Sequence, residues 1–256
     1  MAKLTDYIAV FDSGIGGISV LRELVRQMPG EHYLYFGDSQ NAPYGDRSTQ
    51  QVKELTLAAA ERLYARGIKA LVIACNTATS AAIAELRKKY PDLIVVGIEP
   101  ALKPAVDRFP EGHIGIMATQ VTLREEKLHS QLSRFPEMQV ALLPAPGLVE
   151  LIESGKATAP ETQALLESIL APYAGKLDAL VLGCTHYPFV KDVIEKILPG
   201  TLLLDGSEGT ARHTRHCLED AGLLENGNGS VQIENSSQNP ALIRLAAELL
   251  EVSDGF

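Results

Sequence analysis

The sequence predicts an α/β protein built from two similar parallel-sheet domains that face each other across a cleft. Short apolar runs alternate with helical patterns along the chain, as in parallel sheets flanked by helices. Two of these runs, residues 70–74 and 179–183, are nearly identical, and each is followed by a cysteine. The separation from Asp12 to Cys75 is 63 residues, and that from Ala118 to Cys184 is 66. A sequence pattern that recurs after such a long interval indicates a duplicated unit.

Strands and helices are expected in regular alternation. Apolar runs rich in β-branched residues predict strands at residues 7–11, 32–36, 69–74, 93–97, 113–118, 139–143, 177–182, 201–205 and 230–234. Helical periodicity predicts helices at residues 19–28, 49–66, 80–90, 122–135, 160–173, 188–198, 210–221 and 240–252. Turn residues near Pro100 and Gly206 predict hinges. We therefore expect a first domain of residues 1–97 with 207–256, and a second domain of residues 98–206.

The composition limits the classes of function. A net charge of -9 without a Lys/Arg-rich patch argues against nucleic acid or an anionic membrane as a partner. No signal peptide and no apolar run of membrane-spanning length is found, so we expect a cytoplasmic protein. The three cysteines are expected to be thiols. A metal site is not expected, because paired ligand spacings are missing, although Cys184 and His186 leave zinc as a weaker alternative.

The loop Asp12–Gly17 follows the first strand and opens the first helix. Its glycines are typical of a site where backbone N–H groups meet an anion, and Asp38 ends the next strand, where a ribose-binding acid would be expected. However, Ser19 stands in place of the third glycine of a dinucleotide fingerprint, and Asp12 would repel pyrophosphate. A smaller anion such as a carboxylate, held by Ser13 and neighbouring amides, is the favoured interpretation.

Two thiols at the ends of similar strands favour acid/base chemistry, because ligands of open α/β sheets bind at the carboxyl edge. Moving the α-proton of an amino acid between its two faces needs an acid and a base on opposite sides. A thiol, with a pKa of about 8.5, suits both roles. Asp12 and His186 are the expected partners of Cys75 and Cys184. A helix starting at Pro188 would place its positive end near Cys184.

The other cysteine and histidines are interpreted as structural or solvated. Cys217 falls in a predicted helix and has no repeated context, so it is expected to behave as a small apolar residue. The same interpretation applies to His32, His113, His129, His213 and His216. Lys69 lies at the start of the strand predicted at residues 69–74 and is interpreted as a surface residue.

Four ordered motifs closely resemble those of the glutamate racemases in the aspartate/glutamate racemase family. They are Phe11–Gly17, Gly37–Ser39 with Ala42–Gly45, Ala74–Thr79 and Gly183–Pro188, and the resemblance covers essentially the whole chain. It implies two related α/β domains with the active site between them. It also implies a cofactor-independent interconversion of L- and D-glutamate that supplies peptidoglycan synthesis, and it leaves a homodimer open.

The resemblance implies roles for individual residues. Cys75 and Cys184 match the two catalytic acid/bases, assisted by Asp12, His186 and a glutamate. Glu153 is favoured as that glutamate over Glu150. The implied substrate contacts are Asp12, Ser13, Tyr44, Gly45, Asn76, Thr77, Thr119, Thr122, Thr185 and His186. Glu125 replaces the small polar residue usual after the threonine pair.

Two further expectations concern specificity. None of the four motifs contains Arg or Lys, so backbone N–H groups and neutral side chains are expected to hold the carboxylates of glutamate. No motif supplies a lysine for a Schiff base, so no cofactor is expected. The alternatives are a racemase for aspartate or another amino acid, and a non-catalytic small-molecule binding module of the same fold.

Overall fold

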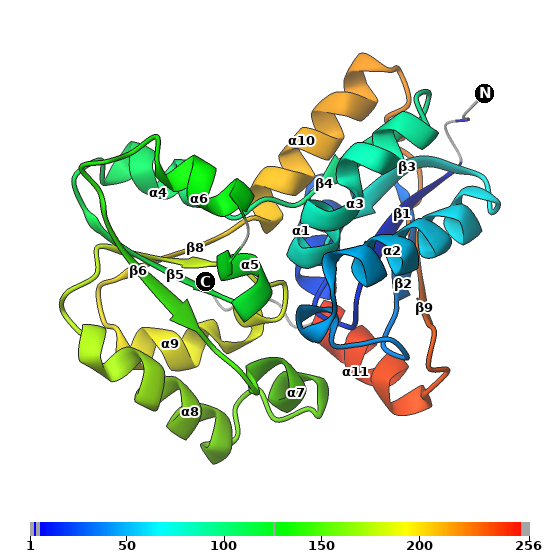
Figure 1. Cartoon of the computed structure of the whole chain (residues 1–256). Coiled ribbons are helices and arrows are strands. Elements are labelled where there is room, and N and C mark those ends of the chain that lie inside the picture. The colour runs from blue at the N-terminus through cyan, green and yellow to red at the C-terminus, as the bar shows by residue number, and fades with distance from the viewer. Residues whose placement is uncertain (1–2, 4–5, 125, 252–256) are drawn as a thin grey trace. The chain divides into compact units, whose positions relative to one another are not determined.

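The computed structural model describes Lys3, residues 6–124 and residues 126–251, and its chain forms two compact units. The first unit comprises the residues up to Ile98 together with those from Ser207 onward, and the second is Glu99–Gly206. Each unit contains one parallel sheet with its own helices (Figure 1). The prediction of two parallel-sheet α/β domains is therefore confirmed.

The sheet of the first unit has five strands. Their order across the sheet is β4 (Ile94–Gly97), β3 (Ile68–Ile73), β1 (Tyr7–Asp12), β2 (His32–Gly37) and β9 (Ser230–Asn235). Every neighbouring pair is parallel. The central strands β1 and β3 are buried almost throughout, which explains their near-continuous apolar sequence.

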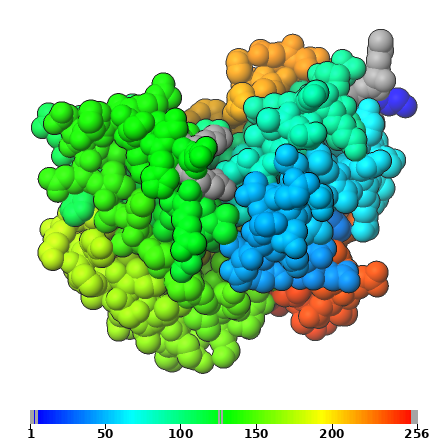
Figure 2. All heavy atoms as spheres, viewed as in Figure 1, coloured from blue at the N-terminus to red at the C-terminus, as the bar shows by residue number. Residues whose placement is uncertain are grey.

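Helices cover this sheet in two groups. On one face, α2 (Thr49–Tyr64) packs against α3 (Asn76–Lys89), and both contribute to a core with Phe11, Leu34 and Leu71. In the other group, α1 (Ile18–Gln27) packs against α10 (Ser207–Asp220) and α11 (Pro240–Glu251). A short 3₁₀ helix, η1 (Tyr44–Asp46), precedes α2. Side chains of α2 and α3 occupy much of the visible face of the first unit (Figure 2).

A buried ion pair holds the segment that precedes β9 against β3. The Lys69 Nζ lies 2.6 Å from Glu31 Oε2, and both side chains are fully buried. Lys69 Nζ also donates to the Leu223 carbonyl at 3.0 Å, while the Glu225 N–H donates to Glu31 Oε1 at 2.8 Å. The expectation that Lys69 lies on the surface is wrong, because it is part of β3 and has Glu31 as its partner. We call these four residues the Lys69 clasp.

The sheet of the second unit has four parallel strands. Their order is β6 (Gln139–Pro144), β5 (His113–Ala118), β7 (Ala179–Leu182) and β8 (Leu202–Asp205). The surrounding helices are α4 (Leu102–Arg108), α5 (Gln120–Arg124), α6 (Glu126–Leu132), α7 (Leu148–Glu153), α8 (Pro160–Leu170) and α9 (Lys191–Ile197), with 3₁₀ helices η2 (Ala171–Tyr173) and η3 (Tyr187–Val190). Two apolar clusters fill the space between helices and sheet.

The two sheets repeat one topology. The order β4-β3-β1-β2 in the first unit corresponds to β8-β7-β5-β6 in the second. Thus β1 and β5 are equivalent, as are β3 and β7, which is the arrangement that the duplicated sequence pattern predicts.

The helices differ from expectation in four places. The predicted helix at residues 122–135 is divided into α5 and α6, and the one at residues 188–198 begins as η3 before α9. Helices α4 and α7 were not predicted at all. In the ranges that the structure describes, no helix has the length and apolar character needed to cross a membrane.

Candidate active site

Cys75 and Cys184 occupy the same place in the two units. Cys75 comes two residues after β3, and Cys184 comes two residues after β7. The residue between strand and cysteine is tied to the neighbouring strand in each case. Ala74 N donates to Phe11 O, and Gly183 N donates to Met117 O, both at 2.8 Å. Both thiols therefore lie at the carboxyl edge of a parallel sheet, where α/β proteins bind ligands.

The thiol of Cys75 caps a helix. Cys75 is the N-cap of α3, and its Sγ accepts a hydrogen bond from Ala78 N at 3.4 Å. The thiol also lies 3.5 Å from the hydroxyl of Ser13, to which it donates. Cys75 is only 6% exposed. The positive end of a helix favours a negatively charged sulfur, so this position suits a thiol that alternates between acid and base.

Asp12 ends β1 and supports the loop that carries Ser13. Its carboxylate is fully buried and accepts a hydrogen bond from Gly14 N at 3.0 Å. The loop lies so close to Asp12 that a Cβ at Gly17 would come within 2.6 Å of the Asp12 Cβ. A glycine at that position is therefore needed for the close approach of the loop to its own strand.

Tyr44 belongs to a buried polar network that the sequence analysis did not foresee. Its hydroxyl donates to Asp38 Oδ2 at 2.7 Å, and the Asn41 amide donates to both carboxylate oxygens of Asp38 at 3.0–3.1 Å. Burial raises the pKa of Tyr44 strongly, and the charges of Asp38, Cys75 and Asp12 add to this effect. Asp38, which was considered only as a ribose ligand, thus fixes a predicted substrate contact close to Cys75. Gly45 follows Tyr44 in η1.

Asn76 and Thr77 form the first turn of α3, directly after Cys75. They are 7% and 6% exposed, respectively. The Asn76 Oδ1 atom is buried and has no hydrogen-bond partner among the described residues. A buried acceptor without a partner is costly, so a ligand that donates a hydrogen bond there would remove a penalty.

Cys184 lies beside a buried histidine that is itself paired with a glutamate. Cys184 Sγ is 3.7 Å from His186 Nδ1, and His186 Nε2 is 2.8 Å from Glu153 Oε1. Burial lowers the pKa of His186, but hydrogen bonds to Cys184 and Glu153 outweigh it, so the pKa lies well above its ordinary value. An imidazolium in this position can share a proton with the thiol and stabilise a thiolate.

The three predicted threonines of the second unit, Thr119, Thr122 and Thr185, lie near the same edge of its sheet. Thr119 follows β5, and its hydroxyl donates to Thr122 Oγ1 at 3.1 Å while accepting from Thr122 N at 3.3 Å. Thr185 lies between Cys184 and His186 and is 4% exposed. Glu125, which departs from the resembled motif, lies outside the described residues.

Tyr187 is a further buried group of this region to which the sequence analysis gave no role. It is fully buried, and its hydroxyl has no hydrogen-bond partner among the described residues. Burial raises the pKa of Tyr187 well above its ordinary value, and the charges of Cys184 and Glu150 add to the shift. Glu150 lies one helical turn before Glu153 on α7. Glu153 is thus the glutamate of this helix that contacts His186.

The model of the Asp/Glu/Hydantoin racemase family matches residues 8–214, which is most of the chain. The chain belongs to this family. The membership predicted from the four motifs is thereby confirmed. The chain is 49% identical to the glutamate racemase of Clostridium kluyveri over 95% of its own length and 97% of that protein. It is 46% identical to the glutamate racemase of Clostridium acetobutylicum, covering 98% and 100% of the two chains.

Solved racemase structures have the same fold. The glutamate racemase of Thermus thermophilus in complex with β-chloro-D-alanine aligns with a TM-score of 0.81 and 35% identity, covering 98% of this chain and 94% of that chain. The Francisella tularensis glutamate racemase in complex with D-glutamate aligns with a TM-score of 0.84 and 27% identity, covering 97% and 95%.

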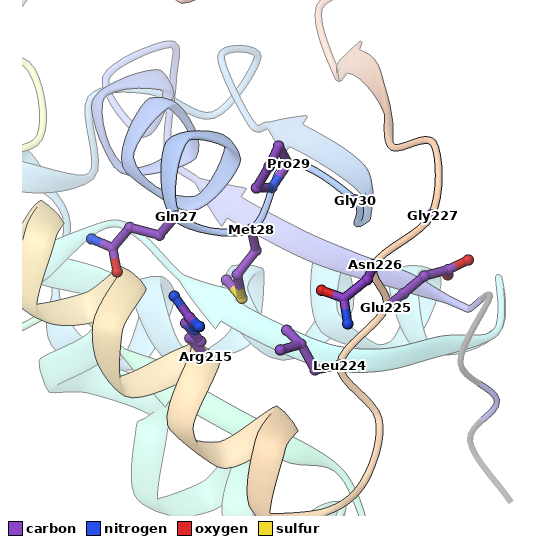
Figure 3. A pocket seen from close by; sticks show the side chains of 9 residues that line it. All are labelled: Gln27, Met28, Pro29, Gly30, Arg215, Leu224, Glu225, Asn226 and Gly227. Carbon is purple, nitrogen blue, oxygen red and sulfur yellow. The ribbon is translucent and has the colours of Figure 1, made fainter.

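A small pocket of this racemase-family chain contains none of the predicted site residues. It measures about 200 Å³ and lies between the segments that precede β2 and β9, with Arg215 of α10 beside it (Figure 3). Those segments lie at the amino ends of the strands, whereas Asp12 and Cys75 lie at the carboxyl ends. The lining residues are Gln27, Met28, Pro29, Gly30, Arg215, Leu224, Glu225, Asn226 and Gly227.

Cys217 has a different histidine neighbour from Cys184 in this racemase-family chain. It lies on α10, with its sulfur 3.8–3.9 Å from the ring nitrogens of His213. Burial raises the pKa of Cys217, and Asp220 adds to the shift. Within the described ranges, no group of three or more His, Cys, Asp or Glu side chains is arranged to hold a metal ion.

Proposed function

We propose that this protein interconverts L- and D-glutamate by moving the α-proton between Cys75 and Cys184, without a cofactor. The observation that carries this proposal is the equivalent placement of the two thiols after β3 and β7, each with its own polar partners. The glutamate racemases named above support the choice of substrate, because they align over nearly the whole chain.

Each turnover would exchange the protonation states of the two cysteines. When L-glutamate is bound, the Cys184 thiolate takes the α-proton and becomes a thiol, and the electron pair of the broken C–H bond stays on the α-carbon. The Cys75 thiol then gives its proton to the opposite face and becomes a thiolate, which yields D-glutamate. The reverse reaction runs the same steps backwards, as microscopic reversibility requires. The assignment of each thiol to one enantiomer follows the family resemblance.

The polar neighbours have distinct roles in this scheme. His186, held by Glu153, would stabilise the Cys184 thiolate, and Asp12 would assist on the Cys75 side. The unpaired Asn76 Oδ1 suits the ammonium group of the substrate. We assign the remaining contacts to neutral groups: Ser13, Tyr44, Gly45, Thr77, Thr119, Thr122 and Thr185. Neutral donors can bind carboxylates without holding both sulfurs permanently as thiolates.

D-glutamate is a building block of peptidoglycan, so the enzyme supplies cell-wall synthesis. We place it in the cytoplasm, where free amino acids are available. A homodimer is also proposed, and light scattering at assay concentration would test it.

The first experiment follows the circular dichroism of L- and D-glutamate with dialysed protein. The signal should decay to zero from either side. A decay that occurs only after pyridoxal phosphate or a metal ion is added would overturn the cofactor-free mechanism.

A second experiment separates the two thiols. Cys75→Ser and Cys184→Ser should each abolish racemisation, because a hydroxyl is far too weak an acid to replace the thiol. With a β-substituted glutamate whose carbanion expels a leaving group, Cys75→Ser should still process the L form and Cys184→Ser the D form. Cys217→Ser is the matched control and should retain activity. Loss of activity in Cys217→Ser, or the same surviving enantiomer in both variants, would refute the assignment.

A further inference from the structure

Tyr187 and Cys184 lie one turn apart in a 3₁₀ arrangement. Tyr187 N donates to Cys184 O at 3.1 Å, which is the i to i+3 bond of such a turn. Side chains three residues apart in a 3₁₀ turn lie one above the other. Both side chains belong to the same apolar cluster, together with residues of α7. The i to i+3 spacing therefore places the side chains of Tyr187 and Cys184 on the same side of the turn.

The buried hydroxyl of Tyr187 lowers the stability of the folded protein. It is fully buried and unpaired among the described residues, and burying an unpaired polar group destabilises a fold. Phenylalanine would fill the same volume without this cost. By comparison, Tyr33 and Tyr35, which are also buried, donate their hydroxyls to backbone carbonyls. The Tyr187 hydroxyl thus lacks the structural partner that comparable tyrosines of this chain have.

We propose that Tyr187 is a positioning residue for Cys184, whose hydroxyl donates a hydrogen bond to the sulfur when that sulfur is a thiolate. This inference deepens the proposed function and rests on it. A hydrogen bond to a charged acceptor is stronger than one to a neutral acceptor, so the contact favours the state in which Cys184 acts as a base. The hydroxyl remains a donor throughout, because burial and the charges of Cys184 and Glu150 raise the pKa of Tyr187.

Several ionisable groups act around Cys184. His186 precedes η3, Glu153 and Glu150 come from α7, and Tyr187 itself belongs to η3. A change at Tyr187 therefore has to be separated from a change at His186. Full racemisation cannot distinguish the two cysteines. The enantiomers have equal free energies, so any variant changes kcat/KM equally in both directions. Elimination from one enantiomer, in contrast, reports on one cysteine at a time.

The first test measures the reactivity of the Cys184 thiol in Tyr187→Phe. With Cys75 and Cys217 replaced by Ser, Cys184 is the one remaining thiol, and its alkylation by iodoacetamide is followed against pH by mass spectrometry. Tyr187→Phe should raise the midpoint of that profile by about one pH unit, equivalent to a tenfold loss of thiolate. Tyr173→Phe is the matched control, because Tyr173 packs against the same cluster and should leave the midpoint unchanged. His186→Asn is measured in parallel and gives the effect of losing the imidazole.

The elimination assay gives the second result. Tyr187→Phe should slow elimination from the L form about tenfold in the Cys75→Ser background, and it should leave elimination from the D form unchanged in the Cys184→Ser background. An unchanged alkylation midpoint, or equal losses for both enantiomers, would overturn the role of Tyr187. Unfolding of Tyr187→Phe would also contradict it, since the hydroxyl would then have a structural role. If Cys184→Ser left racemisation intact, the proposed function itself would fail.

Discussion

His186 joins the carboxylate of Glu153 to the thiol of Cys184. One ring nitrogen lies 2.8 Å from Glu153 Oε1, and the other lies 3.7 Å from Cys184 Sγ. The histidine side chain is 3% exposed, so solvent screens these interactions little. A carboxylate on α7 thus influences a thiol that lies in another part of the sequence, and this relationship makes stability depend on pH.

Stability should decrease as the pH rises through the titration of His186. The folded-state pKa of His186 is raised above its ordinary value of 6.5, so protonated His186 stabilises the fold fully below that value and loses this contribution as pH passes the folded-state pKa. Glu153→Gln should weaken this pH dependence. Urea unfolding between neutral and alkaline pH measures it. Glu167→Gln, on the exposed side of α8, is the control, and identical profiles for Glu153→Gln and the wild type would contradict the prediction.

Asn76→Ala should weaken substrate binding more than it slows the chemical step. The buried Asn76 Oδ1 is free to accept a hydrogen bond from the substrate ammonium, so its loss should raise KM about tenfold, the equivalent of one hydrogen bond. Steady-state kinetics with both enantiomers measure KM and kcat separately. Ser80→Ala, an exposed change on α3, should alter neither value. An unchanged KM in Asn76→Ala would exclude this contact.

Lys69→Met should destabilise the first unit strongly. The substitution leaves the fully buried Glu31 carboxylate without its cation, and breaking a buried pair in this way costs about 3–5 kcal/mol. The double change Lys69→Met with Glu31→Leu should recover much of this loss, because it removes both charges. Urea unfolding measures each free energy. Lys103→Met breaks the exposed pair with Asp107 and should cost less than about 1 kcal/mol. Equal effects of Lys69→Met and Lys103→Met would contradict the role of the clasp.

Glutamate should be strongly preferred over aspartate. If neutral hydrogen-bonding groups hold the side-chain carboxylate, the shorter aspartate leaves some of them unpaired, and such a mismatch can cost a factor of about a hundred or more in kcat/KM. Proton exchange in deuterated water, followed by mass spectrometry, compares the two substrates. Similar values for glutamate and aspartate would assign the protein to a broader racemase.

The strands could be predicted from the sequence because their signal is local. All nine expected strands are present and differ by at most two residues at either end, since buried parallel strands are continuous apolar runs. Helices α4 and α7 were missed because they have only seven and six residues, too few to establish a helical period.

The partners of the site residues depend on tertiary packing. Glu150 and Glu153 lie three residues apart on one helix, so their sequence contexts hardly differ, and only the packing of α7 against η3 selects Glu153 for His186. Lys69 shows the same limit. Its partner Glu31 comes just before β2, and no local pattern indicates that a lysine at the start of a strand is buried.

The Lys69 clasp can form only late in the synthesis of the chain. Strand β9 and the Leu223 carbonyl come after the whole of Glu99–Gly206, although they complete the first unit. During translation the ribosome synthesises every residue of the second unit before the edge strand of the first unit. All residues of the second unit are therefore available for folding first. Glu31 and Lys69 become buried only after the final segment of the chain has been made.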